Sequence, residues 1–166
     1  MAGEVVVRPA NDSDSGQVTA LIARCWVAYP GNVLDIQGEM PINRAVATGF
    51  KKSGGQFWVA TLPTSTGDWI VGCVGVQPAG PAMAELVKMY THPDLRRRGI
   101  ARRLAALPEQ TASRWKSQQI ELWSDYRFTE AHAFYQAIGY EQTGKTRTLH
   151  DLSNTTEYHF IKSLSG

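Results

Sequence analysis

The stretch from residue 84 to residue 115 changes its hydrophobic period abruptly, and this change restricts the possible folds more than any other feature. Residues 84–91, AELVKMYT, form a strand-like run that follows a turn-forming segment. Beyond the loop HPDLRRRG, residues recur at the spacing of one helical face: Ile100, Leu104, Leu107, Thr111 and Trp115. The N-terminus of a helix must therefore follow almost directly on the end of a strand.

Pro108 lies inside this helical pattern. A proline in a helix interior removes one backbone hydrogen bond and clashes with the preceding turn. We therefore expect either a kink or two helical segments that meet near Leu107.

The remaining segments alternate between strand and helix patterns, which predicts a mixed α+β chain. A first helix carries Val18, Leu21, Ile22, Cys25 and Tyr29 on one face, and shorter helices are expected at 42–52 and 128–140. Further strands are expected at 4–8, 56–62, 68–77, 119–125, 141–150 and 156–164. Pro and Gly clusters separate the strands between residues 56 and 91, as in an antiparallel meander.

Length and composition favour one ordinary globular domain over residues 1–166. The chain has 166 residues, of which 43% are hydrophobic, enough for a core without disulfides or a structural metal. Cys25 and Cys73 match no metal-ligand spacing and are expected to be reduced, buried thiols, and the four histidines predict no metal site. No window approaches the length of a membrane span. We expect a cytoplasmic protein with no membrane partner.

The charge of the chain is small overall but concentrated in one window. The formal net charge is +2, whereas residues 88–103 hold six positive side chains and one negative, which gives +5. A helix N-terminus exposes unpaired N–H groups and the positive end of its dipole, so this loop could hold a phosphate group, with Gly99 allowing close backbone approach. A solvated arginine cluster is the alternative.

Two segments of the chain resemble the GNAT superfamily of N-acetyltransferases, and in particular its bacterial small-molecule members. Arg96-x-x-Gly99-x-Ala101 follows Tyr90-Thr91-His92-Pro93 and resembles the acetyl-CoA-binding signature R/Q-x-x-G-x-G/A. Further on, AHAFYQAIGYEQTG resembles the closing helix of the family, and the order of elements matches over nearly the whole chain. The resemblance implies an α+β fold with a twisted, mostly antiparallel sheet of six to seven strands flanked by four helices.

The same resemblance implies acetyl-CoA as the cofactor and CoA as a product. Backbone N–H groups from Arg97 to Arg102 would hold the diphosphate, and the edge of the preceding strand would pair with the pantetheine arm. The implied cofactor contacts are Met89, Tyr90, Thr91, Arg96, Arg97, Arg98, Gly99, Ile100, Ala101, Arg102, Phe128 and Phe134. Phe128 departs from the family pattern, because many members have an asparagine there.

Two residues are expected to carry the catalysis. Tyr135 matches the tyrosine that protonates the departing thiolate in the family, although packing alone could also explain an aromatic residue on that helix face. Glu85 lies six residues before Thr91, where some members place a glutamate base. Asp125 or a chain of water molecules is the alternative base.

The acceptor side is expected to be lined by the loop after the first helix. Trp26, Tyr29, Asp35 and Glu39 lie there, and with Asp125 they combine aromatic rings and acids that suit an ammonium group. Packing and solvation explain the same residues equally well.

The sequence thus predicts an enzyme that moves an acetyl group from acetyl-CoA to a primary amine of a small acceptor, by direct attack within a ternary complex. A non-catalytic CoA-binding module and a nucleic-acid-binding module are the alternatives. The small net charge and the lack of an extended basic stripe argue against nucleic acid. A homodimer is possible through the closing hairpin or the edge of the fourth strand.

Overall fold

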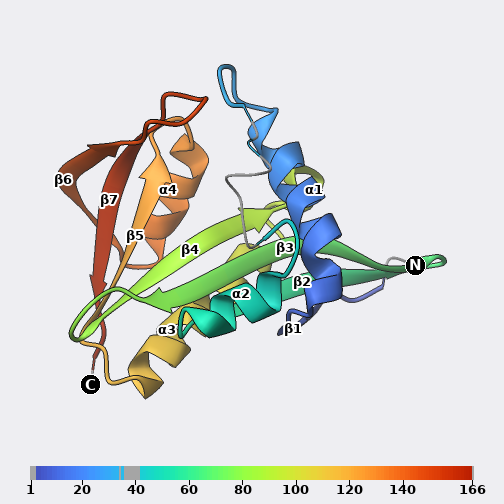
Figure 1. The fold of residues 1–166 in the computed structure, drawn as a ribbon, viewed down its shortest axis with the longest axis horizontal. Helices are drawn as coiled ribbons and strands as arrows, with labels where there is room; N and C mark the ends of the chain where they lie inside the picture. Colours follow the sequence, from blue (N-terminus) through green and yellow to red (C-terminus); the bar gives the residue numbers. More distant parts are fainter. Residues whose placement is uncertain (1–2, 34, 36–41, 166) are drawn as a thin grey trace.

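The described residues, 3–33, 35 and 42–165 of a computed structural model, form a seven-stranded sheet with the order β1-β2-β3-β4-β5-β7-β6 (Figure 1). Only β4 and β5 run parallel within this described sheet; every other neighbouring pair is antiparallel. The strands are β1 (Val6–Pro9), β2 (Gln56–Thr64), β3 (Gly67–Pro78), β4 (Met83–Thr91), β5 (Gln119–Asp125), β6 (Glu141–Thr148) and β7 (Thr156–Ser163). The predicted α+β fold with a mostly antiparallel sheet is confirmed.

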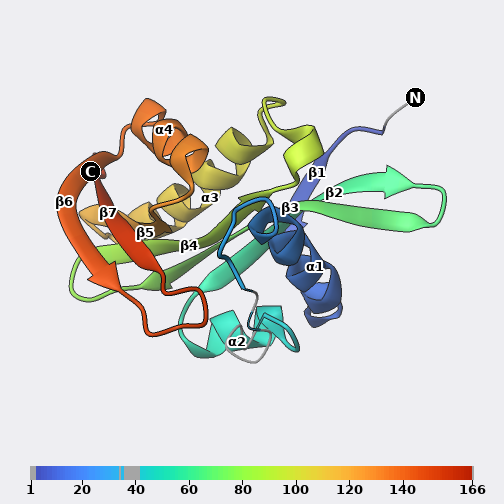
Figure 2. The same cartoon turned by 90° about the horizontal axis from the view of Figure 1, so that it is seen from above.

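The helices cover the sheet on both faces. They are α1 (Ser15–Trp26), α2 (Val46–Lys52), α3 (Ile100–Arg114) and α4 (Thr129–Ala137), with single 3₁₀ turns η1 (Asp12–Asp14) and η2 (Pro93–Leu95). Figure 2 shows α1 and α2 on one face and α3 and α4 on the other. Among the described helices, none has the length and apolar character needed to span a bilayer.

Alternation of side chains along the strands produces two apolar cores. In β4, Ala84 and Leu86 pack in the core under α3 and α4, whereas Val87 packs against the core under α1 and α2. The thiols of Cys25 and Cys73 are buried, as predicted, and burial raises the pKa of Cys25 to about 11. A thiol with so high a pKa is almost entirely protonated at neutral pH and is a poor nucleophile.

The expected division of the third helix into two segments is wrong. The helix α3 continues from Ile100 to Arg114 with Pro108 inside it. Pro108 is buried, as are Leu104 before it and Thr111 after it. The apolar face of α3 therefore packs on the sheet along its whole length, and this tertiary packing maintains the helix despite the hydrogen bond that proline cannot make.

The first two helices are shorter than predicted. The helix α1 ends at Trp26, so Tyr29 lies in a turn, where its N–H donates to the carbonyl of Trp26 at 3.0 Å. The following Pro30 disfavours helical geometry at Tyr29. The helix α2 begins only at Val46, where the backbone N–H is bound by the Ser15 hydroxyl at 2.9 Å, a contact with the first residue of α1.

Close packing over Gly75 in β3 gives a test of the α1/α2 core. A Cβ at Gly75 would lie 2.7 Å from Phe50 Cε1 and 2.9 Å from Phe57 Cδ2. Gly75→Ala should therefore lower the free energy of unfolding by about 1–3 kcal/mol, measured by urea denaturation. Gly16→Ala is the control, because nothing lies within 4 Å of its Cβ position. Equal midpoints for the two variants would contradict this packing.

Candidate functional site

The strands β4 and β5 pair over only three residues and then separate. The pairs run from Met83 with Gln119 to Glu85 with Glu121, while β4 continues to Thr91. Figure 1 shows the two strands diverging beyond this point. The described part of β5 provides no further partner to β4, so the β4 edge from residue 86 onward can pair with an extended ligand arm.

A bulge marks the middle of this edge. The register between β3 and β4 shifts between Cys73 and Gly75, opposite Lys88, whose φ is 53°. A bulge of this kind turns the main-chain groups of the bulged strand relative to its neighbours.

The N-terminus of α3 lies just after the end of β4 and has no side-chain cap. Gly99, with a φ of 78°, precedes the helix, and the first backbone bond runs from the N–H of Arg103 to the carbonyl of Gly99 at 3.1 Å. Apart from its chain neighbours, no heavy atom of the described residues lies within 4 Å of the position that a Cβ of Gly99 would take. Open space, unpaired N–H groups and the helix dipole together fit a diphosphate group.

The arginines around this helix end have different surroundings. Arg97, Arg98 and Arg102 are exposed, as expected of side chains that meet an external anion. Arg96 forms an ion pair with Glu130 at 3.2 Å, and Arg103 donates to the carbonyl of Val5 at 3.0 Å. Arg103 therefore fixes the N-terminal segment, and Arg96 links the loop to α4.

Tyr135 lies on α4, on the face of the sheet that α3 also covers. It is 6% exposed and belongs to the same core as Leu86 of β4 and Leu122 of β5. Its ring centroid is 5.8 Å from that of Phe134 and 5.9 Å from that of Phe160. Burial raises the pKa of the phenol, so Tyr135 remains protonated at neutral pH.

Glu85 faces the opposite side of the sheet, because it alternates with Ala84 and Leu86. Its carboxylate accepts a hydrogen bond from Gln77 Nε2 at 3.2 Å. Burial raises the pKa of Glu85 above the ordinary value of a glutamate; the bond from Gln77 acts in the other direction. A carboxylate with a raised pKa is a better proton acceptor near neutral pH.

Asp125, the alternative base, is already engaged by its neighbour. One carboxylate oxygen accepts the backbone N–H of Arg127 at 2.9 Å, and the other accepts Arg127 Nη1 at 3.2 Å. The carboxylate of Asp125 is thus used to orient Arg127.

Arg127 was not anticipated from the sequence. Its guanidinium also donates to Asn32 Oδ1 and, at 2.7 Å, to the carbonyl of Ser153. The hydroxyl of Ser153 in turn accepts the backbone N–H of Val33 at 2.7 Å. Arg127 therefore ties the loop after α1 to the loop between β6 and β7, which no local pattern could have indicated.

Aromatic side chains gather beside the end of β4. Trp26 Nε1 donates to the Tyr90 hydroxyl at 2.9 Å, and the ring of Phe128 lies 4.7 Å from Tyr29 and 6.5 Å from Tyr90. Four residues predicted for the cofactor or the acceptor thus meet in one aromatic group. Phe128 contributes a ring where the family pattern has an amide.

Two further expectations concern the acidic residues of the loop after α1. Asp35 is exposed, and Glu39 lies outside the described residues.

Within the described ranges, no group of three or more His, Cys, Asp or Glu side chains could hold a metal ion.

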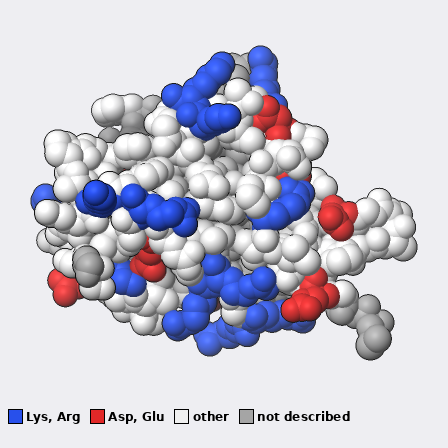
Figure 3. All heavy atoms as spheres, turned by 90° about the horizontal axis from the view of Figure 1, so that it is seen from below, with Lys and Arg blue, Asp and Glu red and all other residues white. Residues whose placement is uncertain are grey.

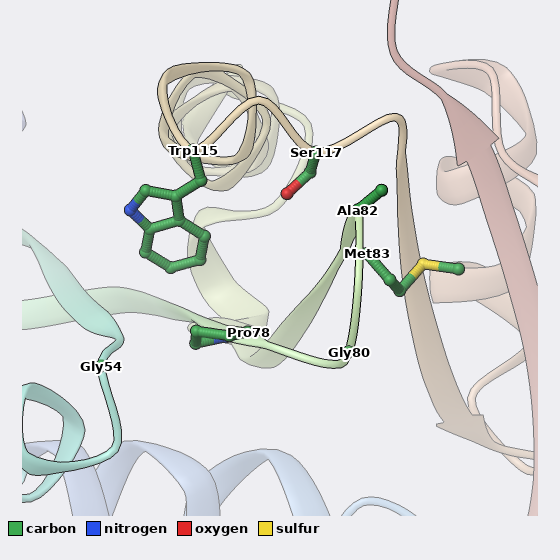
Figure 4. A pocket seen from close by; sticks show the side chains of 7 residues that line it. All are labelled: Gly54, Pro78, Gly80, Ala82, Met83, Trp115 and Ser117. Atoms are coloured by element: carbon green, nitrogen blue, oxygen red, sulfur yellow. The ribbon is translucent and has the colours of Figure 1, made fainter.

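A shallow hollow lies at the other end of β4, near its beginning (Figure 4). Its lining includes Pro78, Met83 and Trp115 and has no charged side chain. Trp115 follows α3 and is 37% exposed, so it does not share the buried face predicted for it. This hollow therefore lacks the groups needed for proton transfer or for phosphate binding.

Comparison with known proteins agrees with this geometry. The chain resembles an acetyltransferase of the GNAT family from Staphylococcus aureus, with a TM-score of 0.81, 20% identity and coverage of 98% of this chain and 100% of the other. It also resembles the PaiA N-acetyltransferase from Thermoplasma acidophilum, solved with coenzyme A, with a TM-score of 0.72, 15% identity and coverage of 96% and 99%. Comparison with curated proteins found no significant match.

A family model gives the assignment that these distant structures cannot. The model described as "Acetyltransferase (GNAT) domain" matches residues 53–142, more than half of the chain. The matched range contains β4, the uncapped N-terminus of α3 and Tyr135. The chain belongs to the GNAT family of acetyltransferases, for which acetyl-CoA is the cofactor.

Proposed function

We propose that the protein transfers the acetyl group of acetyl-CoA to a primary amine by direct attack within a ternary complex, with Glu85 as the base and Tyr135 as the acid. One observation carries this proposal. Glu85 and Tyr135 flank the diverging strands β4 and β5 from opposite faces of the sheet. An amine could therefore lose its proton on one face while the leaving sulfur gains a proton on the other.

The residues around the α3 N-terminus support the cofactor assignment. When bound, acetyl-CoA supplies an acetyl thioester, and its diphosphate suits the unpaired N–H groups that follow Gly99. The exposed guanidinium groups of Arg97, Arg98 and Arg102 add positive charge around this position. Backbone N–H groups of β4 could donate to an oxyanion, and each such donor is worth about 3 kcal/mol in comparable enzymes.

The distribution of charge argues against the nucleic-acid alternative. Figure 3 shows lysine and arginine side chains in separate groups, with acidic and uncharged surface between them. Binding along a nucleic-acid backbone is typical of an extended basic patch or stripe, which the face drawn in Figure 3 does not carry.

Removal of the two proton-transfer groups tests the mechanism. Glu85→Gln and Tyr135→Phe should each lower kcat by about 100-fold or more, measured with acetyl-CoA and a panel of spermidine, lysine, phenethylamine and a short peptide. Glu141→Gln and Tyr126→Phe are matched controls, because both residues are exposed. Wild-type turnover in the Tyr135→Phe variant would show that Tyr135 is a core residue only.

The pH dependence of the reaction provides a second test. Glu85 accepts a proton only as a carboxylate, and burial raises its pKa. We therefore expect kcat/KM to fall as pH decreases through this raised pKa, at a higher pH than an exposed glutamate would produce. A rate that stays constant down to the pH range of an ordinary glutamate would contradict the assignment of Glu85.

Cofactor binding can be tested without an acceptor. Ala101 lies in the first turn of α3, where a carboxylate is compatible with the helix dipole but repels a diphosphate. Ala101→Glu should raise the Kd for CoA at least tenfold, or about 1.4 kcal/mol, by calorimetry. Ala101→Gln, of similar size but neutral, should have a much smaller effect. Equal affinities for the two variants would mean that the diphosphate binds elsewhere.

A further inference from the structure

The sheet face that carries Glu85 also carries a chain of polar side chains beyond β4. Glu85 pairs in register with Glu121 of β5, and Glu121 alternates with the core residues Ile120 and Leu122. Neighbouring residues of paired strands project to the same face. Glu85 and Glu121 therefore stand side by side at the last pair before β4 and β5 separate.

His159 of β7 holds Glu121 from the other side. Its Nε2 lies 2.7 Å from Glu121 Oε2, and its Nδ1 lies 2.8 Å from the hydroxyl of Thr143 on β6. His159 is only 3% exposed, and its ring lies 4.6 Å from that of Trp123. Both ring nitrogens thus have partners, and the imidazole cannot turn without losing both contacts.

The partners of the two ring nitrogens indicate which nitrogen of His159 donates a hydrogen bond. When Glu121 is ionised its carboxylate only accepts, and Nε2–H then donates to it. The Thr143 hydroxyl can donate to a neutral Nδ1 or accept from a protonated one, because it rotates. His159 therefore donates to Glu121 in either charge state.

Further charged groups on this face are the ion pair of Glu157 with Arg147 and the exposed Glu141 of β6, which pairs in register with Ile161 opposite Glu121. Glu157 of β7 accepts from Arg147 Nε at 2.6 Å, and the Arg147 guanidinium lies 4.5 Å from the ring of Trp123. Gln77 is the neighbour of Glu85 on β3. Glu85 and Glu121 are the two carboxylates that meet in register at the position where the strands separate.

We propose that His159 is a positioning residue for acetyl transfer, whose hydrogen bond holds the carboxylate of Glu121 beside Glu85, so that Glu85 is the carboxylate that accepts the proton. The inference rests on the proposed role of Glu85. Two neighbouring carboxylates disfavour each other's ionised form, and a hydrogen-bond donor stabilises the carboxylate that receives it. Without the donor, the carboxylate of Glu121 could turn away from Glu85, and its effect of raising the pKa of Glu85 would weaken.

The matched pair His159→Gln and His159→Asn tests this role. The amide nitrogen of Gln can reach the position of Nε2 and donate to Glu121, whereas that of Asn reaches only the position of Nδ1. The titration of Glu85 is followed by NMR of carboxyl-labelled glutamate, with Glu85→Gln and Glu121→Gln to assign the signals. This measurement needs no acceptor.

We expect the midpoint of Glu85 in His159→Gln to match the wild type. In His159→Asn and in the isosteric Glu121→Gln it should move to lower pH by about half a unit or more. The acidic limb of kcat/KM with the best amine of the panel should move in the same direction, while the KM for acetyl-CoA stays within about twofold.

An unchanged Glu85 midpoint in either His159→Asn or Glu121→Gln would overturn the inference. If His159→Asn does not fold, Glu121→Gln decides alone, because it removes the charge without a change of size. Wild-type activity of Glu85→Gln would instead overturn the proposed base, whatever the titrations give, so the two failures are distinguishable.

Discussion

The separation of β4 from β5 after the pair Glu85–Glu121 is the constraint on which the site depends. Parallel strands cannot be joined by a tight turn, so the chain must cross over the sheet between them. The crossover here is α3, and its N-terminus therefore lies immediately after β4. The edge of β4 with which β5 does not pair and the N-terminus of a helix are thereby adjacent, as an extended ligand with a diphosphate at one end requires.

Because side chains alternate along the same strands, Tyr135 packs on one face of the sheet and Glu85 projects from the other. Leu86 and Leu122 pack with Tyr135 under the helices α3 and α4, which isolates the phenol from solvent and keeps it protonated. Glu85 and Glu121 project to the other face, where α1 packs on β3 and β4 and α2 packs on β2 and β3. Glu85 and Tyr135 therefore lie on opposite faces of one pleated sheet.

Loops far apart in the sequence complete the open side of the sheet. Arg127 joins Asn32 to Ser153, and Phe128 beside it contacts Tyr29 and Tyr90. The consecutive residues 127 and 128 therefore orient both the polar and the aromatic contacts of the loop after α1. The sequence predicted this region least well, because its contacts join segments that lie far apart in the chain.

The sequence by itself determined the features that depend on neighbours in the chain. Helical spacing, Gly99 before a helix and Tyr135 on a short helix ending near Gly139 are local, and the fold contains them as predicted. Only the tertiary structure decided that α3 continues through the buried Pro108 and that His159 bonds to Glu121, 38 residues away. Sheet register and packing determine which residues of distant strands meet. Neither of them leaves a periodic pattern in the sequence, so these contacts could not be predicted from it.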